Sequence, residues 1–410
     1  MKNHPLIQTL LNLKGNPRAV LYTEPLWQIP FGLYSPFISV YMAALLLTDQ
    51  QIGIVASISA LFQGLSALLS GAITDKLGRK WTTLIFDIIS WSIPALLWAL
   101  SQNFWWFAIA GALNGFMQVT ANSWTCLFIE DAEKSSIAKL FTLAHLSAQL
   151  GIIFAPIAAL MVSNLSIVPA MRIIFAFTCL SMTSKFILLF IYCEETKTGK
   201  VRLAETKDQS LFKIMSGYGG ILRRILASKS MVLTLAIVTL FAAANMIMFN
   251  FFGLYAMLLV PTHMLAFFPI ARSLIITLFM FGLQNFMDRL GISRPMLMGI
   301  ALYAAGHAAL ILPLGYLSLA FYIFLEACAY SLVMPRRDSL FTVLVDPDER
   351  ARINGVLFAL SFGITIPFGV FAGFLSNIDR RLPFLANIGI FVLAFCVIVR
   401  NRKFLTEKMR

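Results

Sequence analysis

Two charged side chains lie deep inside long apolar segments, where a charge is costly and therefore usually functional. Glu326 is roughly 14 Å from the start of its segment near Leu317, at about 1.5 Å per helical residue. Arg272 has a similar depth in the segment that begins near Met264. We expect the two to form an ion pair, with Tyr330 one helical turn beyond Glu326. The alternative is that Arg272 binds an anionic solute while Glu326 binds a proton.

A set of carboxamides follows helical spacing in the segment that begins near Phe104. Asn114, Gln118 and Asn122 are each four residues apart, so a continuous helix would place them on one face. Such a face would hydrogen-bond a polar solute, or it would join packed helices within a membrane. Both interpretations are open from the sequence.

Other polar residues interrupt further apolar segments. His145 and Gln149 are one turn apart, and a lone histidine is more often a packing residue than a proton carrier. Asn245 stands in a run rich in Phe and Met, most of which we expect to face lipid. Near segment ends, Lys185 is expected to extend to the membrane surface, and Asp87 is expected to pair with a basic loop.

The stretch VLYTEPLWQIPFGLYSP, residues 20–36, carries a carboxylate, an amide and three prolines inside an apolar run. In one interpretation a helix starts at Pro25, and Glu24 lies at its positive end. In the other, the helix starts near Arg18, and Glu24 and Gln28 belong to a polar stripe along a proline-kinked helix. Gln28 is a candidate site residue in both cases, and Glu24 in the second.

Only long helices could position these residues, and the composition agrees. Of 410 residues, 59% are hydrophobic and 12% charged, whereas soluble domains carry about 25% charged residues. Twelve apolar blocks, each near the length that spans a bilayer, begin near Arg18, Gln51, Trp81, Phe104, Ala138, Val168, Ser230, Met264, Pro295, Leu317, Ile353 and Leu382. The sequence predicts an all-α polytopic membrane protein with 12 transmembrane helices. The 5 cysteines show no metal-ligand spacing, so neither a disulfide nor a metal site is expected.

Basic residues predict the orientation in the membrane. Of the 32 Lys and Arg residues, all except Arg172, Lys185, Arg272, Arg380 and Arg381 fall in the termini or in connections after even-numbered blocks. Both termini are therefore expected on the cytoplasmic side of the cell membrane. The net charge of +13 is attributed to topology and anionic lipid, and no nucleic-acid partner is expected.

A long polar stretch, residues 193–210, divides the chain midway. It predicts six-helix bundles at residues 1–192 and 230–410, joined by a cytoplasmic loop at residues 193–229. The second part of that loop is either an amphipathic interfacial helix or an irregular basic linker.

Two motifs occur once in each half at nearly one offset. GAITDKLGRK follows the second block and MDRLGISR the eighth, while EKSSIAKLF enters the fifth block and ERARINGVLF the eleventh. This agreement predicts duplicated repeats that run parallel, related by an axis along the membrane normal.

The pattern G-x-x-x-D-[KR]-x-G-R-[KR] resembles the signature between helices 2 and 3 of the major facilitator superfamily. It consists of Gly71, Asp75, Lys76, Gly78, Arg79 and Lys80, with a degenerate second copy at Asp288, Arg289 and Gly291. The resemblance extends to the twelve helices, the central loop and the cytoplasmic ends. It implies two pseudo-symmetric six-helix bundles, with helices 1, 4, 7 and 10 lining a central cavity.

The residues of this motif suggest a conformational latch. The glycines permit close approach and a tight turn. Asp75 is expected to accept hydrogen bonds from helix-end amides, while Arg79 bridges to Glu130 or Asp131 at the inner end of helix 4. Such contacts would hold the two halves in one arrangement. The alternative is a solvated loop that only fixes topology, which is favoured for the lysines alone.

The resemblance implies a secondary active transporter that moves a small solute by alternating access, without a cofactor and as a monomer. The chain has no G-x-x-x-x-G-K-[ST] motif, so a proton gradient acting through Glu24 or Glu326 is the expected driver. Glu326 is the better candidate.

Uptake of a polar or anionic solute is slightly favoured over the alternative, efflux of amphipathic compounds. The fourth segment lacks the arginine of many drug exporters, and Ala155 precedes Pro156 where they carry glycine. A membrane-embedded enzyme or non-transporting sensor is a remote alternative, because no catalytic constellation is evident; the chain is not expected to be an enzyme.

Overall fold

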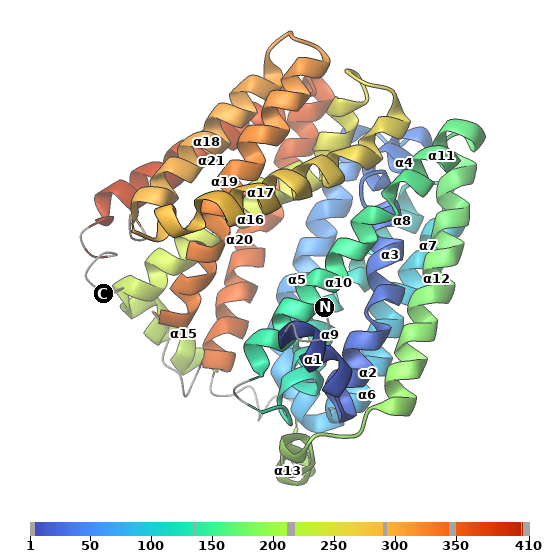
Figure 1. The fold of residues 1–410 in the computed structure, drawn as a ribbon, viewed down its shortest axis with the longest axis vertical. Helices are drawn as coiled ribbons and strands as arrows, with labels where there is room; N and C mark the ends of the chain where they lie inside the picture. The colour runs from blue at the N-terminus through green and yellow to red at the C-terminus, as the bar shows by residue number, and fades with distance from the viewer. Residues whose placement is uncertain are drawn as a thin grey trace. The chain divides into compact units, whose positions relative to one another are not determined.

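The apolar blocks form long helices in the computed structural model, which describes residues 5–133, 136–210, 218–289, 293–343, 350–402 and 404. Over these residues the secondary structure is helical, with no strand. Ten stretches among them are long and apolar enough to cross a membrane. The expectation of an all-α polytopic membrane protein is confirmed (Figure 1).

The chain folds into two compact units. Unit 1 comprises Met1–Ser35 and Ile58–Gly219, and unit 2 comprises Pro36–Ser57 and Gly220–Arg410. Most of the central polar segment therefore packs with unit 1, and a short piece of the amino-terminal half packs with unit 2. The division into duplicated six-helix bundles stays a prediction.

The helices of unit 1 are α1 (Pro5–Asn12), α2 (Gly15–Thr23), α3 (Pro25–Tyr34), α6 (Arg79–Asp87), the π-helical segment η1 (Ile88–Ser92), α7 (Ile93–Leu100), α8 (Phe104–Asn114), α9 (Met117–Ile129), α10 (Ile137–Ile153), α11 (Ala155–Leu165), α12 (Ile167–Tyr192) and α13 (Lys197–Thr206). The long helix α5 (Asp49–Leu77) has residues in both units.

The helices of unit 2 are α4 (Ile38–Ala44), α15 (Tyr218–Ala227), α16 (Lys229–Ala256), the 3₁₀ segment η2 (Thr262–Ala266), α17 (Phe267–Arg289), α18 (Ser293–Ile311), α19 (Tyr316–Val343), α20 (Arg350–Ile378) and α21 (Leu382–Arg400). The helices of both units begin within a few residues of the predicted blocks.

Two predicted membrane segments are broken helices. The fourth is divided into α8 and α9 beside Gly115, where an added Cβ would lie 2.4 Å from the Cβ of Phe62. The first is divided into α2, α3 and α4, whose boundaries coincide with prolines that lack an amide donor. The break at Glu24 is slight: its backbone is α-helical, and the Gln28 amide donates to its carbonyl at 3.1 Å. The interpretation in which the helix starts near Arg18 is therefore favoured, with α2 beginning at Gly15.

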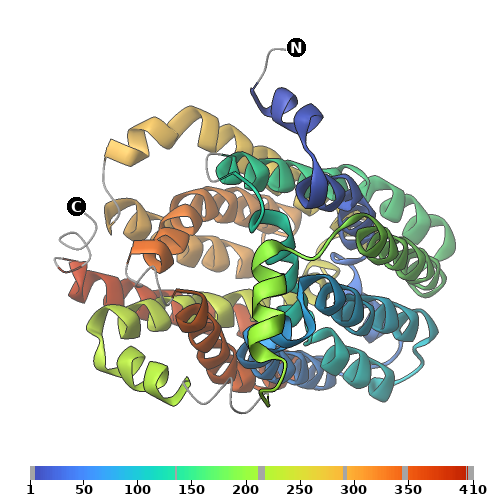
Figure 2. The same cartoon turned by 90° about the horizontal axis from the view of Figure 1, so that it is seen from below.

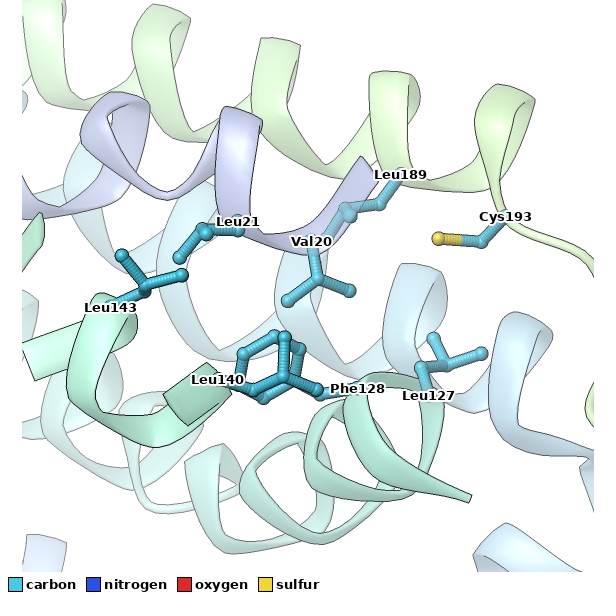
Figure 3. Close-up of a cluster of buried hydrophobic side chains, with 8 residues drawn as sticks. All are labelled: Val20, Leu21, Leu127, Phe128, Leu140, Leu143, Leu189 and Cys193. Atoms are coloured by element: carbon cyan, nitrogen blue, oxygen red, sulfur yellow. The ribbon is translucent and has the colours of Figure 1, made fainter. Parts of the chain in front are cut away.

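The core of unit 1 near its α2 end is a cluster of apolar side chains from four helices. Val20 and Leu21 of α2 pack between side chains of α9, α10 and α12 (Figure 3). The remaining members are Leu127, Phe128, Leu140, Leu143, Leu189 and Cys193. Burial raises the pKa of the Cys193 thiol to about 11, as expected of a structural cysteine.

The central polar segment contains more helix than the sequence predicts. Helix α13 lies beyond the ends of α6 and α12 (Figures 1 and 2). The amphipathic alternative for the following segment is favoured over an irregular linker, since α15 is helical. Its Ile221 and Ile225 are buried, while Arg223 and Arg224 are exposed.

Candidate functional site

A bidentate ion pair joins α17 to α19 in unit 2. Arg272 Nε lies 2.6 Å and Nη2 3.0 Å from the two carboxylate oxygens of Glu326. The guanidinium also lies over the ring of Tyr330, 4.3 Å from its centroid, and so gains a cation–π contact. The expected ion pair is therefore present. Arg272 is the more accessible member, with 36% of its side chain exposed against 12% for Glu326.

A second ion pair, which is buried in unit 1, corrects the expectation for Lys185. Its ammonium does not extend to the membrane surface but lies 2.8 Å from Glu24 Oε2, with both side chains under a tenth exposed. The other oxygen of Glu24 accepts a hydrogen bond from Gln28 Nε2 at 3.0 Å. The rings of Trp27 and Trp124 lie 5.9 and 6.0 Å from the Lys185 ammonium. Glu24 and Gln28, the candidate residues of the first segment, therefore form one hydrogen-bonded network with Lys185 of α12.

Asp87 also differs from its expected place. It is buried at the end of α6, 5% exposed, rather than paired with the basic loop. The charges of Lys185 and Glu24 act on its carboxylate, and the hydroxyl of Thr120 lies nearby. That hydroxyl donates to the Met117 carbonyl at 3.2 Å. Three ionisable side chains from three predicted membrane segments therefore meet inside unit 1.

The carboxamides of the fourth segment bond to neighbouring helices. Asn114 Nδ2 donates to the Ser90 carbonyl in η1 at 2.8 Å, and Asn122 Nδ2 donates to Thr74 Oγ1 at 3.1 Å. Gln118 Nε2 is 3.5 Å from the side-chain oxygen of Gln63. Because the helix is broken at Gly115, the three do not form one continuous stripe. These contacts favour the helix-joining interpretation.

His145 and Gln149 on α10, and Asn245 on α16, are exposed. Polar groups on membrane-spanning helices generally avoid lipid and face a bundle interior or a water-filled cavity. The three therefore keep their place as candidates for a solute pathway.

The signature motif forms a charged network in unit 1. Arg79 Nε lies 3.1 Å from Glu130 Oε2, and Arg79 Nη1 lies 3.1 Å from Asp75 Oδ1. The expected bridge from Arg79 to the inner end of helix 4 is thus present, with Glu130 as its partner. Thr196, from the central segment, also donates to Glu130.

The amides at the start of α6 are capped by a residue that the sequence analysis did not select. Glu195 accepts from the backbone amides of Arg79 and Lys80 at 3.0 and 3.1 Å, whereas Asp75 was expected in this role. A carboxylate there satisfies otherwise unpaired donors and the helix dipole. Lys80 places its ammonium 4.5 Å from the ring centroid of Phe190. The second copy, at Asp288, Arg289 and Gly291, lies outside the residues whose side chains are described.

The turn before α6 requires glycine. Gly78 has φ +82° and ψ 160°, a region that costs other residues about 1–3 kcal/mol. An added Cβ would also lie 2.5 Å from Glu195 Oε2. We therefore predict that Gly78→Ala lowers the thermal midpoint of the purified protein and weakens the capping contact.

Gly220→Ala is the matched control for this substitution, because an added Cβ at that helical position meets no atom within 4 Å. Differential scanning fluorimetry of both variants in detergent measures the effect. Equal midpoints for the two would contradict the requirement for glycine at residue 78.

The sequence analysis missed an ion pair in unit 2. Arg380 Nε lies 2.9 Å from Asp49 Oδ2, which also accepts from Ser376 Oγ at 2.7 Å. Arg380 Nη1 donates to the carbonyl of Leu254 at 3.1 Å. One available signal was Arg380 itself, one of the few basic residues on the predicted outer face.

The backbones of α5 and α20 approach each other closely near this ion pair. An added Cβ at Gly53 would lie 2.2 Å from the Gly369 carbonyl oxygen. Ser57 Oγ donates to the Ile366 carbonyl at 2.6 Å and accepts from the Val370 amide at 3.0 Å, so a hydroxyl stands within the hydrogen-bond ladder of α20. Such insertion bends helices, and it fixes the start of α5 against α20.

His307 is a further buried polar residue that the sequence did not point to. Its Nδ1 bonds to the Tyr303 carbonyl at 2.8 Å, and its Nε2 accepts from Asn387 Nδ2 at 3.2 Å. This arrangement joins α18 to α21 and suits a neutral packing histidine. Over the described residues, no group of three or more His, Cys, Asp or Glu side chains is placed to hold a metal ion.

The sequence family described as the Major Facilitator Superfamily matches residues 28–357 of the chain. The chain is 26% identical over 127 residues to the uncharacterized MFS-type transporter YqjV of Bacillus subtilis (strain 168), a match covering 30% of this chain and 31% of that protein. It is 34% identical over 96 residues to the multidrug resistance protein MdtG of Serratia proteamaculans (strain 568), covering 21% and 23%. The chain thus matches less than a third of the length of either relative.

Solved structures resemble the fold over nearly the whole chain. The nucleoside transporter NupG superposes with a TM-score of 0.71 at 18% identity, covering 94% of this chain and 99% of that one. The peptide transporter POT in complex with sulfate gives 0.72 at 11% identity, covering 99% and 100%. At these identities the likeness concerns the fold alone.

Proposed function

The chain belongs to the major facilitator superfamily, and on that premise we propose that it is a secondary active transporter that moves a small solute across the cell membrane by alternating access. The observation that carries the proposal is the Arg272–Glu326 pair, a bidentate ion pair between two predicted membrane spans. Charged side chains within membrane spans commonly mark a solute or ion pathway. We place both termini on the cytoplasmic side, as the basic residues predict.

The solute in this proposal is small and polar or anionic. Arg272 supplies a partly exposed guanidinium, which binds carboxylate or phosphate groups in a bidentate manner. The carboxamides of α8 and α9 support this choice less than the sequence suggested, because they bond to other helices. Protons are the proposed coupling ion, and the chain contains buried carboxylates able to exchange them.

Efflux of amphipathic compounds is the second candidate function. The match to multidrug resistance protein MdtG favours it, although that match covers 21% of this chain. The two candidates differ in the direction of transport and in the charge of the solute, so one experiment can separate them.

The test is transport by the full chain reconstituted into liposomes that contain a pH-sensitive dye. Small carboxylates, phosphorylated compounds, nucleosides and amphipathic cations are added one class at a time, with an imposed pH gradient. We expect an anionic class to drive a change in internal pH, and empty liposomes serve as the control. A response restricted to amphipathic cations favours efflux, whereas radiolabelled solutes that never cross the membrane would contradict transport.

A further inference from the structure

A buried cluster in unit 1 contains two carboxylates but a single ammonium. Glu24 from the α2–α3 junction, Lys185 from α12 and Asp87 from the end of α6 are 6%, 4% and 5% exposed. A net charge buried in a membrane-spanning bundle is strongly unfavourable, because the charge loses its hydration without gaining a partner. One of the two carboxylates must therefore be neutralised. Binding a proton achieves this without room for an additional ion.

The contacts identify which carboxylate remains ionised. Glu24 receives a hydrogen bond at each oxygen, from the Lys185 ammonium at 2.8 Å and from Gln28 Nε2 at 3.0 Å. Donors directed at both oxygens favour the charged form of a carboxylate. Glu24 and Lys185 thus form a complete pair, and they leave no positive charge for a second acid.

Among the described residues, Asp87 takes part in no ion pair, because the Lys185 ammonium is bonded to Glu24. The groups that act on it are Lys185 and Glu24, of opposite sign, and the Thr120 hydroxyl. A hydroxyl is able to donate to a carboxylate or to accept from a carboxylic acid, so it suits either protonation state. We infer that Asp87 is the proton-binding residue of the transporter, and that the Glu24–Lys185 pair holds it in place.

The surroundings of the cluster support a proton rather than a metal ion. The ammonium of Lys185 would repel a cation such as sodium, and the nearby rings of Trp27 and Trp124 offer no oxygen ligand. Outside the cluster, the charged groups of α6 are Arg79, which pairs with Glu130 just after α9, and Lys80, whose ammonium lies over the ring of Phe190.

The position of Asp87 connects a proton to the latch. Helix α6 begins at Arg79 and ends at Asp87, while α9 carries Thr120 and is followed directly by Glu130. The same two helices are also joined by Thr83 and Ser123, whose hydroxyls are 2.8 Å apart. In addition, η1 follows Asp87 directly, and π-helical turns often occur at functional sites. A proton at one end of the α6–α9 interface therefore acts on the interface that the latch closes at the other end.

This inference rests on the proposed function for its role in coupling, but its central claim needs no solute. Infrared difference spectra of the purified full chain, recorded between alkaline and acidic pH, detect a buried carboxylic acid by its C=O stretching band. We expect this band in the wild type and its loss in Asp87→Asn. Glu205→Gln is the control, because the side chain of Glu205 is 52% exposed.

A second variant serves if Asp87→Asn does not fold. Thr120→Val removes the hydroxyl beside the acid, and it is expected to shift the band without abolishing it. Retention of the band in Asp87→Asn or an unchanged band in Thr120→Val would each overturn the assignment.

The liposome assay then addresses coupling. Asp87→Asn should still exchange solute across the membrane, with at least about tenfold less accompanying proton movement, equivalent to about 1.4 kcal/mol. A variant that moves solute and protons like the wild type overturns the role of Asp87. A chain that shows the infrared band but transports nothing would instead refute the proposed function and leave the proton site intact.

Discussion

Glu326→Gln is expected to reduce solute transport by at least about tenfold, which corresponds to about 1.4 kcal/mol of lost stabilisation. The substitution keeps the shape of the side chain but removes the charge that holds Arg272 in its bidentate geometry. The guanidinium is then free to turn toward the ring of Tyr330 or toward water. A solute that binds to Arg272 would then find the guanidinium in the wrong position and bind less well. The initial rate of uptake measures this loss.

The charge-reversed double variant Arg272→Glu/Glu326→Arg separates positioning from packing. It restores an ion pair between α17 and α19, so the thermal midpoint should recover more than the transport rate. As a matched control, Glu205→Gln removes one member of the exposed pair Arg202–Glu205, and surface pairs contribute little. Transport by Glu326→Gln at the wild-type rate would show that the pair is only a helix-packing contact.

The helices and the Arg272–Glu326 ion pair were predictable from the sequence, because both follow from the lengths of the apolar segments. Apolar length identifies the spans, and two opposite charges at matched depth predict a pair, as with Arg272 and Glu326. The same comparison of depths, applied to the amino-terminal half, would have predicted the cluster of Glu24, Asp87 and Lys185. Counted from the ends predicted to be cytoplasmic, Glu24, Asp87 and Lys185 each lie about two turns into their helices. They were instead treated singly, and Lys185 was assigned to the surface because long basic side chains near helix ends commonly extend there.

The remaining contacts depend on geometry that a single sequence does not contain. The break at Gly115 separates Asn114 from Gln118 and Asn122, and no spacing rule for a continuous helix anticipates it. The cap at the start of α6 comes from Glu195, more than a hundred residues later in the chain. Likewise, Asp49 and Arg380 meet only because α5 and α20 approach through glycines.

Lys185→Met is expected to be the most destabilising single substitution in unit 1. It preserves an unbranched apolar side chain, but it leaves Glu24 without the ammonium that lies 2.8 Å from its carboxylate. Removing one partner of a buried pair typically costs about 3–5 kcal/mol, because the other charge stays buried and uncompensated. A large fall in the thermal midpoint of the purified protein measures this loss.

Glu24→Gln and the double variant Glu24→Gln/Lys185→Met complete the thermodynamic cycle. If the loss in Lys185→Met arises from an unpaired carboxylate, removing that carboxylate as well should return part of the stability, so the double variant should be more stable than the sum of the two single effects. Glu24→Gln alone should cost less than Lys185→Met, because Asp87 is still available to compensate the ammonium. Additive effects in the cycle would mean that Glu24 and Lys185 contribute independently, and the two-carboxylate cluster would lose its basis.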